Sequence, residues 1–149
     1  MGDVAGFLAR VGQSSSSSRR RILSALHEGI IAADPRVSAR VGKMMGREMI
    51  IYEEKGIFKY ALSSTKTRMS LHAMPMYGST AIRSRYAKLL SSAKFQKGCI
   101  NFKSDEEMPP ETVKQFIEDC AKVDYIAMVE LHHKNSSASR RRSVVGAVH

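Results

Sequence analysis

Three consecutive strands are predicted by the sequence EMIIYEEKGIFKYALSSTKTRMSLHAMP, which runs from Glu48 to Pro75. Aromatic and β-branched residues are frequent in it, and such residues favour the pleated surface of a sheet. Lys55-Gly56 falls between the first two runs, where glycine can supply the positive φ of a tight hairpin. Pro75 has no N–H to donate and closes the third run. We therefore expect strands over 48–54, 56–63 and 68–74.

The phase of the hairpin decides which side chains face the core. Pairing across Lys55-Gly56 is predicted to turn one set toward the helices, namely Met49, Ile51, Phe58, Tyr60 and Leu62. The opposite set then faces away, namely Ile50, Tyr52, Ile57, Lys59 and Ala61. In the third strand we expect Met69, Leu71 and Ala73 to point inward and Ser70, His72 and Met74 to point outward.

Helices are predicted on both sides of this meander. Before it, apolar spacing favours helices over 4–10, 19–33 and 35–44, and Asp34-Pro35 supplies the cap and first residue of the third. After it we expect a helix over 79–91, a strand over 99–103 and a helix from Pro109-Pro110 to about His133. This order predicts an α+β two-layer sandwich, with a mainly antiparallel sheet and helices on one face.

The size fits a single domain. Of the 149 residues we expect 1–134 to form that domain, with a core at about 19–125, and the Ser/Arg-rich tail over 135–149 to be disordered.

No apolar stretch approaches the ~20 residues that span a bilayer, and no secretory signal is recognisable, so we expect a cytoplasmic protein without a membrane partner. Cys99 and Cys120 are predicted to be free thiols.

The charge is unevenly distributed. The chain has a net charge of +10, and the segment 55–103 contains lysines and arginines but no aspartate or glutamate. Clustered charge of one sign attracts ligands of the other sign. The expected partner is therefore an anionic small molecule or an acidic protein, and the oligomeric state is left open, with a homodimer as one option.

The outward sheet face and its neighbouring loop contain the candidate binding residues. Lysine and histidine can donate to an anion, while tyrosine and methionine offer apolar flanks to a flat ligand. A solvated polar face with no ligand would show the same alternation. The predicted site consists of Tyr52, Lys59, Ser70, His72, Met74, Lys97, Asn101 and Lys103.

No catalytic pattern is recognisable, and we expect a non-enzymatic binding domain. The sequence contains no GxSxG motif. No acid within 55–103 is available to orient His72 as a triad requires, and paired carboxylates are missing from the predicted sheet. No second His, Cys or carboxylate lies near His72 at the spacing of metal ligands.

Two stretches resemble the YdhG-like domains, a family of small bacterial proteins of unknown function. They are GIFKYALSSTKTRMSLHAMPMYGS (Gly56 to Ser79) and AKFQKGCINFKSDEEMPPETVKQFIEDC (Ala93 to Cys120). The family pattern of a strand, a tyrosine and a Lys-Gly strand falls on Met69-Ser70-Leu71-His72, Tyr86 and Lys97-Gly98-Cys99-Ile100-Asn101-Phe102-Lys103. The resemblance covers about residues 19–125 and implies an α/β sandwich from a bacterial source.

Two alternative functions remain. Some YdhG-like relatives are described as frataxin-like iron chaperones, so the resemblance implies iron as an alternative ligand. The acids available for it are Glu53, Glu54, Asp105, Glu106 and Glu107. The third hypothesis is nucleic-acid binding through the cations of 55–103 and the arginine runs at 19–21 and 140–142, with an affinity that falls steeply with salt.

Overall fold

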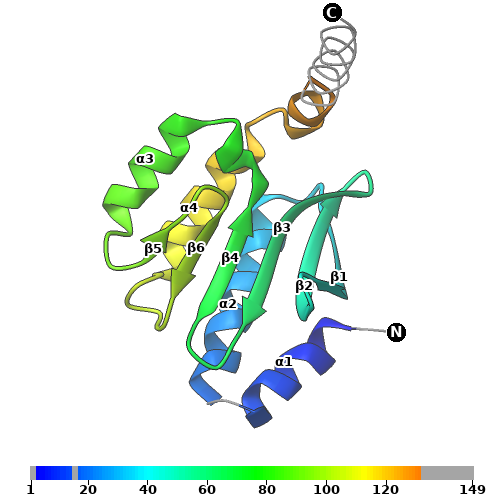
Figure 1. The fold of residues 1–149 in the computed structure, drawn as a ribbon, viewed down its shortest axis with the longest axis vertical. Coiled ribbons are helices and arrows are strands. Elements are labelled where there is room, and N and C mark those ends of the chain that lie inside the picture. The colour runs from blue at the N-terminus through cyan, green and yellow to red at the C-terminus, as the bar shows by residue number, and fades with distance from the viewer. Residues whose placement is uncertain (1–2, 15–16, 132–149) are drawn as a thin grey trace, which may run out of the picture.

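The computed structural model describes residues 3–14 and 17–131 and shows two layers (Figure 1). The strands are β1 (Ser38–Met44), β2 (Arg47–Glu54), β3 (Ile57–Ser64), β4 (Met69–Ala73), β5 (Lys94–Phe95) and β6 (Cys99–Phe102), and the helices are α1 (Val4–Ser14), α2 (Ser17–Ala33), α3 (Thr80–Leu89) and α4 (Pro110–Ala121).

The six-stranded sheet has the order β1-β2-β3-β4-β6-β5, and every neighbouring pair is antiparallel. Helices α1, α2 and α4 lie on one face, and α3 lies beside α4 near the β5 edge. The predicted α+β sandwich is confirmed.

The main core lies between the helices and the sheet. Leu23 and Ile30 of α2 and Phe116 of α4 are fully buried there. Tyr86 of α3 meets Phe116 edge to face, with ring centroids 5.2 Å apart. Burying each large apolar side chain stabilises the fold by about 1.5–3 kcal/mol, which holds these helices on one face of the sheet. Within the described ranges, no helix has both the length and the apolar composition needed to cross a bilayer.

The helix predicted over 35–44 is wrong, because this segment is strand β1. Its valines, Val37 and Val41, are four residues apart, a spacing that fits one face of a strand as well as one face of a helix. Met45-Gly46 then forms a two-residue hairpin in which both residues have positive φ, 53° and 76°. Lys55-Gly56 does the same at 52° and 77°, which confirms the predicted hairpin between β2 and β3.

The final helix is also shorter than expected. It ends at Ala121, and residues 125–131 form a further helix after a break. The carboxylate of Asp124 accepts a hydrogen bond from the backbone N–H of Ala127 at 3.2 Å and so caps the new helix. His132, His133 and the tail over 135–149 lie outside the described residues.

The predicted phase of β2 is wrong by one residue. Ile50 pairs with Leu62 and Tyr52 with Tyr60, and all four side chains lie in the main core. Met49, Ile51 and Ala61 instead form a small apolar cluster on the other face. We call that second face the open face, because none of the helices over 3–14 and 17–131 covers it; Figure 1 looks onto it.

A β-bulge is the physical reason for the error. Tyr52 pairs with Tyr60, but the next residue, Glu53, pairs with Phe58, so Lys59 is the extra residue. An extra residue shifts the alternation of side chains on one side of the bulge relative to the other. Lys59 therefore shares the helix side with Tyr60, and Phe58 turns to the open face. In β4 and β6 the predicted phase is right, because Met69, Leu71, Ile100 and Phe102 lie in the main core.

Candidate functional site

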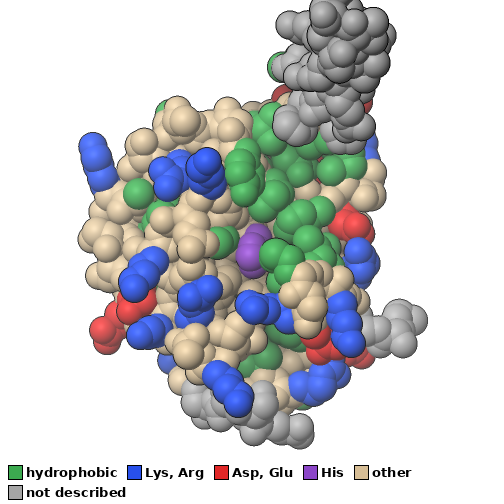
Figure 2. Space-filling view, in the orientation of Figure 1, with side chains coloured by type: hydrophobic (Ala, Val, Ile, Leu, Met, Phe, Trp, Pro, Cys, Tyr) green, Lys and Arg blue, Asp and Glu red, His purple; other side chains and the backbone are tan. Residues whose placement is uncertain are grey.

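The open face contains a hollow of about 560 Å³, which we call the sheet groove. Strands β4 and β6 form its floor, and the β1–β2 turn and the loop between β5 and β6 contribute to its sides. Figure 2 looks onto this face and shows a histidine among hydrophobic side chains, with Lys and Arg side chains around them. The lining residues are Met44, Met45, Arg47, Phe58, Arg68, Ser70, His72, Met74, Tyr77, Gln96, Lys97, Gly98, Cys99 and Asn101.

The floor of the sheet groove is polar and ordered by strand pairing. Ser70 of β4 stands opposite Asn101 of β6, and its hydroxyl donates to Asn101 Oδ1 at 2.6 Å. His72 stands opposite Cys99, whose thiol donates to Gln96 Oε1 at 3.0 Å. The Asn101 side-chain NH₂ group and the His72 ring are therefore the polar groups on the floor that a ligand can use.

Three cationic side chains line the sheet groove, namely Arg47, Arg68 and Lys97, and its described lining includes no carboxylate. Burial lowers the pKa of His72 below 6.5, and the nearby charge of Arg47 lowers it further. Burial raises the pKa of the Cys99 thiol, and the positive charge of Arg68 offsets part of that effect. At pH 7 the floor therefore presents a neutral imidazole and a protonated thiol beside three fixed positive charges.

Apolar side chains complete the sheet groove. Met44, Phe58 and Tyr77 flank the polar floor. The ring of Tyr77 lies against the backbone of Gly98 so closely that a Cβ at that position would overlap it. Gly98 is therefore needed for the observed position of the tyrosine ring.

The structure brings together five of the eight predicted site residues. Ser70, His72, Met74, Lys97 and Asn101 all line the sheet groove. Lys103 lines a neighbouring hollow of about 290 Å³ instead. That hollow shares Arg68 and Asn101 with the sheet groove and also includes Thr67, Ser92, Lys94, Phe102 and Glu107.

Tyr52 and Lys59 do not belong to the site, contrary to the sequence prediction. Both are fully buried on the helix side of the sheet. The hydroxyl of Tyr52 lies 2.6 Å from Nδ1 of His27 on α2. The one-residue error in β2 misplaced Tyr52, and the bulge turned Lys59 inward.

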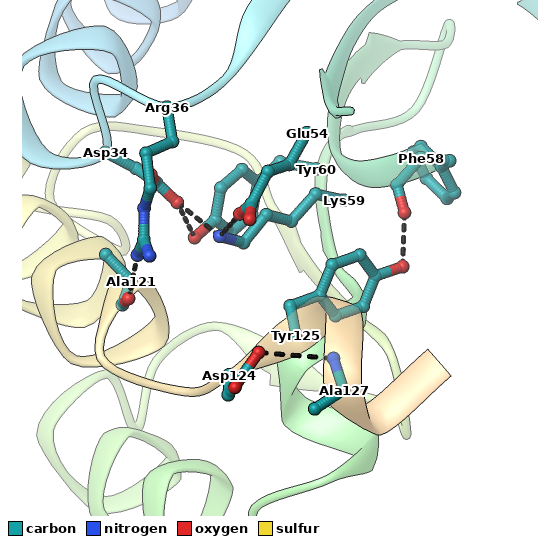
Figure 3. A network of polar contacts seen from close by, with 10 residues as sticks. All are labelled: Asp34, Arg36, Glu54, Phe58, Lys59, Tyr60, Ala121, Asp124, Tyr125 and Ala127. Atoms are coloured by element: carbon teal, nitrogen blue, oxygen red, sulfur yellow. Dashed lines mark hydrogen bonds and ion pairs between the residues drawn. The ribbon is translucent and has the colours of Figure 1, made fainter. Parts of the chain in front are cut away.

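Lys59 is the centre of a buried ionic cluster (Figure 3). Its Nζ lies 2.7 Å from Oδ2 of Asp34 and 2.6 Å from Oε1 of Glu54. Tyr60 donates a hydrogen bond to the same Asp34 oxygen at 2.9 Å. Burial alone would raise the pKa of Asp34, but the hydrogen bonds from Lys59 and Tyr60, together with the positive charges of Lys59 and Arg36, outweigh it and hold this pKa below 3.8. Lys59 and Asp34 have no exposed side-chain surface, so the cluster fixes the fold and cannot meet a ligand directly.

The acids proposed for iron do not converge on one site, and most of them contact different partners. Glu54 contacts Lys59, and Glu53 accepts from Arg40 at 3.0 Å on the β1 side. Asp105 pairs with Arg21 at 3.3 Å, Glu106 is exposed, and Glu107 accepts from the backbone N–H of Lys103 at 2.9 Å. Among the residues that the structure describes, no group of three or more His, Cys, Asp or Glu side chains could hold a metal ion.

The groove residues that the sequence did not predict as part of the site include Arg47, Arg68, Tyr77 and Gln96. Each of these residues lies at or beyond the end of a strand. There the alternation of side chains between the two faces of the sheet no longer predicts which way a side chain points. Arg47 follows the Met45-Gly46 hairpin, which is a signal that β2 begins there and that Arg47 borders the sheet. For Tyr77 and Gln96 the sequence offers no comparable signal.

Comparisons of the chain with family models, with curated proteins and with solved structures found no match. The resemblance to YdhG-like domains therefore stays a prediction, and the functional argument depends on the sheet groove itself.

Proposed function

We propose that the chain is a non-catalytic binding protein that takes an anionic small molecule into the sheet groove. The observation that supports this most is the convergence of Arg47, Arg68 and Lys97 on a hollow whose described lining contains no carboxylate. Such an excess of positive charge raises the local concentration of anions. A concave site of this size suits a small molecule better than the flat surface of an acidic protein partner.

The remaining lining residues indicate what kind of anion fits. Asn101 and His72 offer polar groups on the floor, and Phe58 and Tyr77 offer flat apolar flanks. A ligand with an aromatic or other apolar body and one sulfonate, phosphate or carboxylate group would use both. The cations of the groove would therefore bind the anionic group of the ligand, while the aromatic side chains would pack against its apolar body.

The chemistry of the lining also favours binding over catalysis. His72 has no carboxylate partner among the described groove residues, so nothing fixes its tautomer as an acid would in a triad. The raised pKa of Cys99 keeps its thiol protonated at pH 7, whereas the thiolate is the nucleophile. We also propose membership of the YdhG-like family, with which the observed α+β architecture agrees.

A matched pair of probes tests the proposed function. We expect 1-naphthalenesulfonate to bind about tenfold or more tightly than the neutral 1-naphthalenesulfonamide, because a hydrogen bond to a charged group contributes about 1.5–3 kcal/mol. Isothermal titration calorimetry measures both affinities on the full chain. Equal affinities, or no binding of either probe, would remove the proposal. A single-stranded oligonucleotide that binds in place of the sulfonate, with a steep loss of affinity in salt, would favour nucleic acid instead.

The affinity for 1-naphthalenesulfonate is expected to rise as the pH falls from 8 to 5.5. The free protein has a His72 pKa below 6.5, and a bound anion beside the ring would raise that pKa. Binding is then coupled to proton uptake, so acid conditions favour the complex. The other charged and titratable groups that line the groove are Arg47, Arg68, Lys97, Tyr77 and Cys99, and the raised pKa of Cys99 keeps its thiol protonated across this range. The variant His72→Gln should bind with an affinity independent of pH; an unchanged pH dependence would contradict the assignment.

A further inference from the structure

A second hollow of about 580 Å³ lies next to the sheet groove. Met74 and Tyr77 form one side, on the 3-10 helix η1 (Met74–Tyr77), and Tyr125, Met128 and Val129 form the other, on the helix over 125–131. We call it the apolar groove. Its described lining contains no charged side chain, in contrast to the sheet groove.

The two grooves adjoin each other, because Met74 and Tyr77 line both. Figure 2 shows hydrophobic side chains gathered from the upper part of the open face down to the histidine. The charged side chains of the sheet groove therefore stand at one end of a surface whose other end is apolar.

The wall of the apolar groove is fixed to the sheet. The hydroxyl of Tyr125 donates to the backbone carbonyl of Phe58, a residue that lines the sheet groove (Figure 3). The ammonium of the buried Lys59 lies 5.8 Å from the centre of the Tyr125 ring. Met128 packs directly over Gly78, where a Cβ would overlap its sulfur. The helix over 125–131 is thus held at a defined distance from η1.

We propose that the ligand is an amphipathic anion, with its charged head in the sheet groove and its hydrocarbon chain in the apolar groove. This inference rests on the proposed function and names the ligand class. A small compact anion would leave Met128 and Val129 without contact, whereas an alkyl chain would cover both. Methionine side chains adapt to flexible apolar chains because they are unbranched and rotate freely. The concave, two-part surface suits a single dispersed molecule and does not suit a flat bilayer.

A chain-length series tests the inference on the full protein. Sodium hexyl, octyl, decyl and dodecyl sulfates are titrated below their critical micelle concentrations, with calorimetry for affinity and amide chemical shifts for location. We expect the affinity to rise roughly fourfold for each added methylene, since each buried methylene contributes about 0.8 kcal/mol. The shifts at Met128 and Val129 should grow with chain length, while those at Ser70 and His72 should appear with every member.

Two substitutions separate the tail site from the head site. Met128→Gln and Val129→Asn are expected to reduce the gain per methylene at least twofold and to leave the affinity for 1-naphthalenesulfonate unchanged. Leu89→Asn is the matched control, because Leu89 is 55 % exposed on α3 and lines neither groove. The control should behave like the unaltered chain in both assays.

The outcomes distinguish the two proposals. If 1-naphthalenesulfonate binds the sheet groove but affinity does not depend on alkyl length, the amphipathic ligand is wrong and the anion site stands. If neither probe binds, both proposals are wrong. If the chain binds phosphatidylglycerol vesicles but no monomeric alkyl sulfate, the site is a membrane contact and the inference is overturned.

Discussion

Replacing Lys59 by methionine is expected to lower the free energy of unfolding by about 3–5 kcal/mol, the usual effect of removing one partner from a buried ion pair. The methionine would fill a similar volume but remove the ammonium group that contacts both Asp34 and Glu54. Asp34 Oδ1 has no hydrogen-bond partner in the described structure and lies 3.6 Å from Nε of the exposed Arg36, which is a weak substitute for the buried ammonium group. Urea denaturation, followed by circular dichroism, measures the change.

Two controls show whether the charge is responsible. Lys66→Met removes an exposed lysine from the β3–β4 turn and should change the free energy by less than about 0.5 kcal/mol. Combining Lys59→Met with Asp34→Asn and Glu54→Gln removes the uncompensated charges and should recover part of the loss. A Lys59→Met protein as stable as the unaltered chain would contradict the buried cluster.

Replacing both Arg68 and Lys97 by glutamine is expected to weaken 1-naphthalenesulfonate binding roughly a hundredfold or more. Each cation that donates to the sulfonate contributes about 1.5–3 kcal/mol, which is about tenfold to a hundredfold in affinity. Both side chains are exposed, so the fold should tolerate the change. Calorimetry at fixed ionic strength gives the two affinities.

The control for this prediction removes the same number of charges elsewhere. Lys88 on α3 and Lys114 on α4 are exposed and line none of the described grooves. The double variant Lys88→Gln, Lys114→Gln should lose less than about threefold in affinity, because exposed charges beyond a Debye length of about 8–10 Å are largely screened. Equal losses in the two double variants would mean that overall charge, and not the sheet groove, attracts the anion.

The sequence predicts the parts of the fold that depend on local periodicity. The Lys55-Gly56 hairpin and the inward residues of β4 and β6 follow from turn chemistry and strict alternation. Those two strands supply Ser70, His72 and Asn101, and for this reason part of the site was predictable.

Most of the errors come from features that depend on distant residues. The bulge at Lys59 brings its ammonium to Asp34, which is 25 positions earlier in the chain, and nothing in the local sequence signals that contact. The error over 35–44 has a local cause instead, because the spacing of Val37 and Val41 is compatible with both a helix and a strand. The rim residues Tyr77 and Gln96 depend on where irregular segments cross the sheet, which periodicity cannot indicate.

The central claim is that the open face binds anions through the sheet groove, and an amide chemical-shift map tests it most directly. With 1-naphthalenesulfonate at saturating concentration, we predict the largest shifts at Ser70, His72, Lys97 and Cys99, with little change on α2 or α4. Shifts confined to the helical layer, or spread evenly over exposed lysines and arginines, would contradict the account.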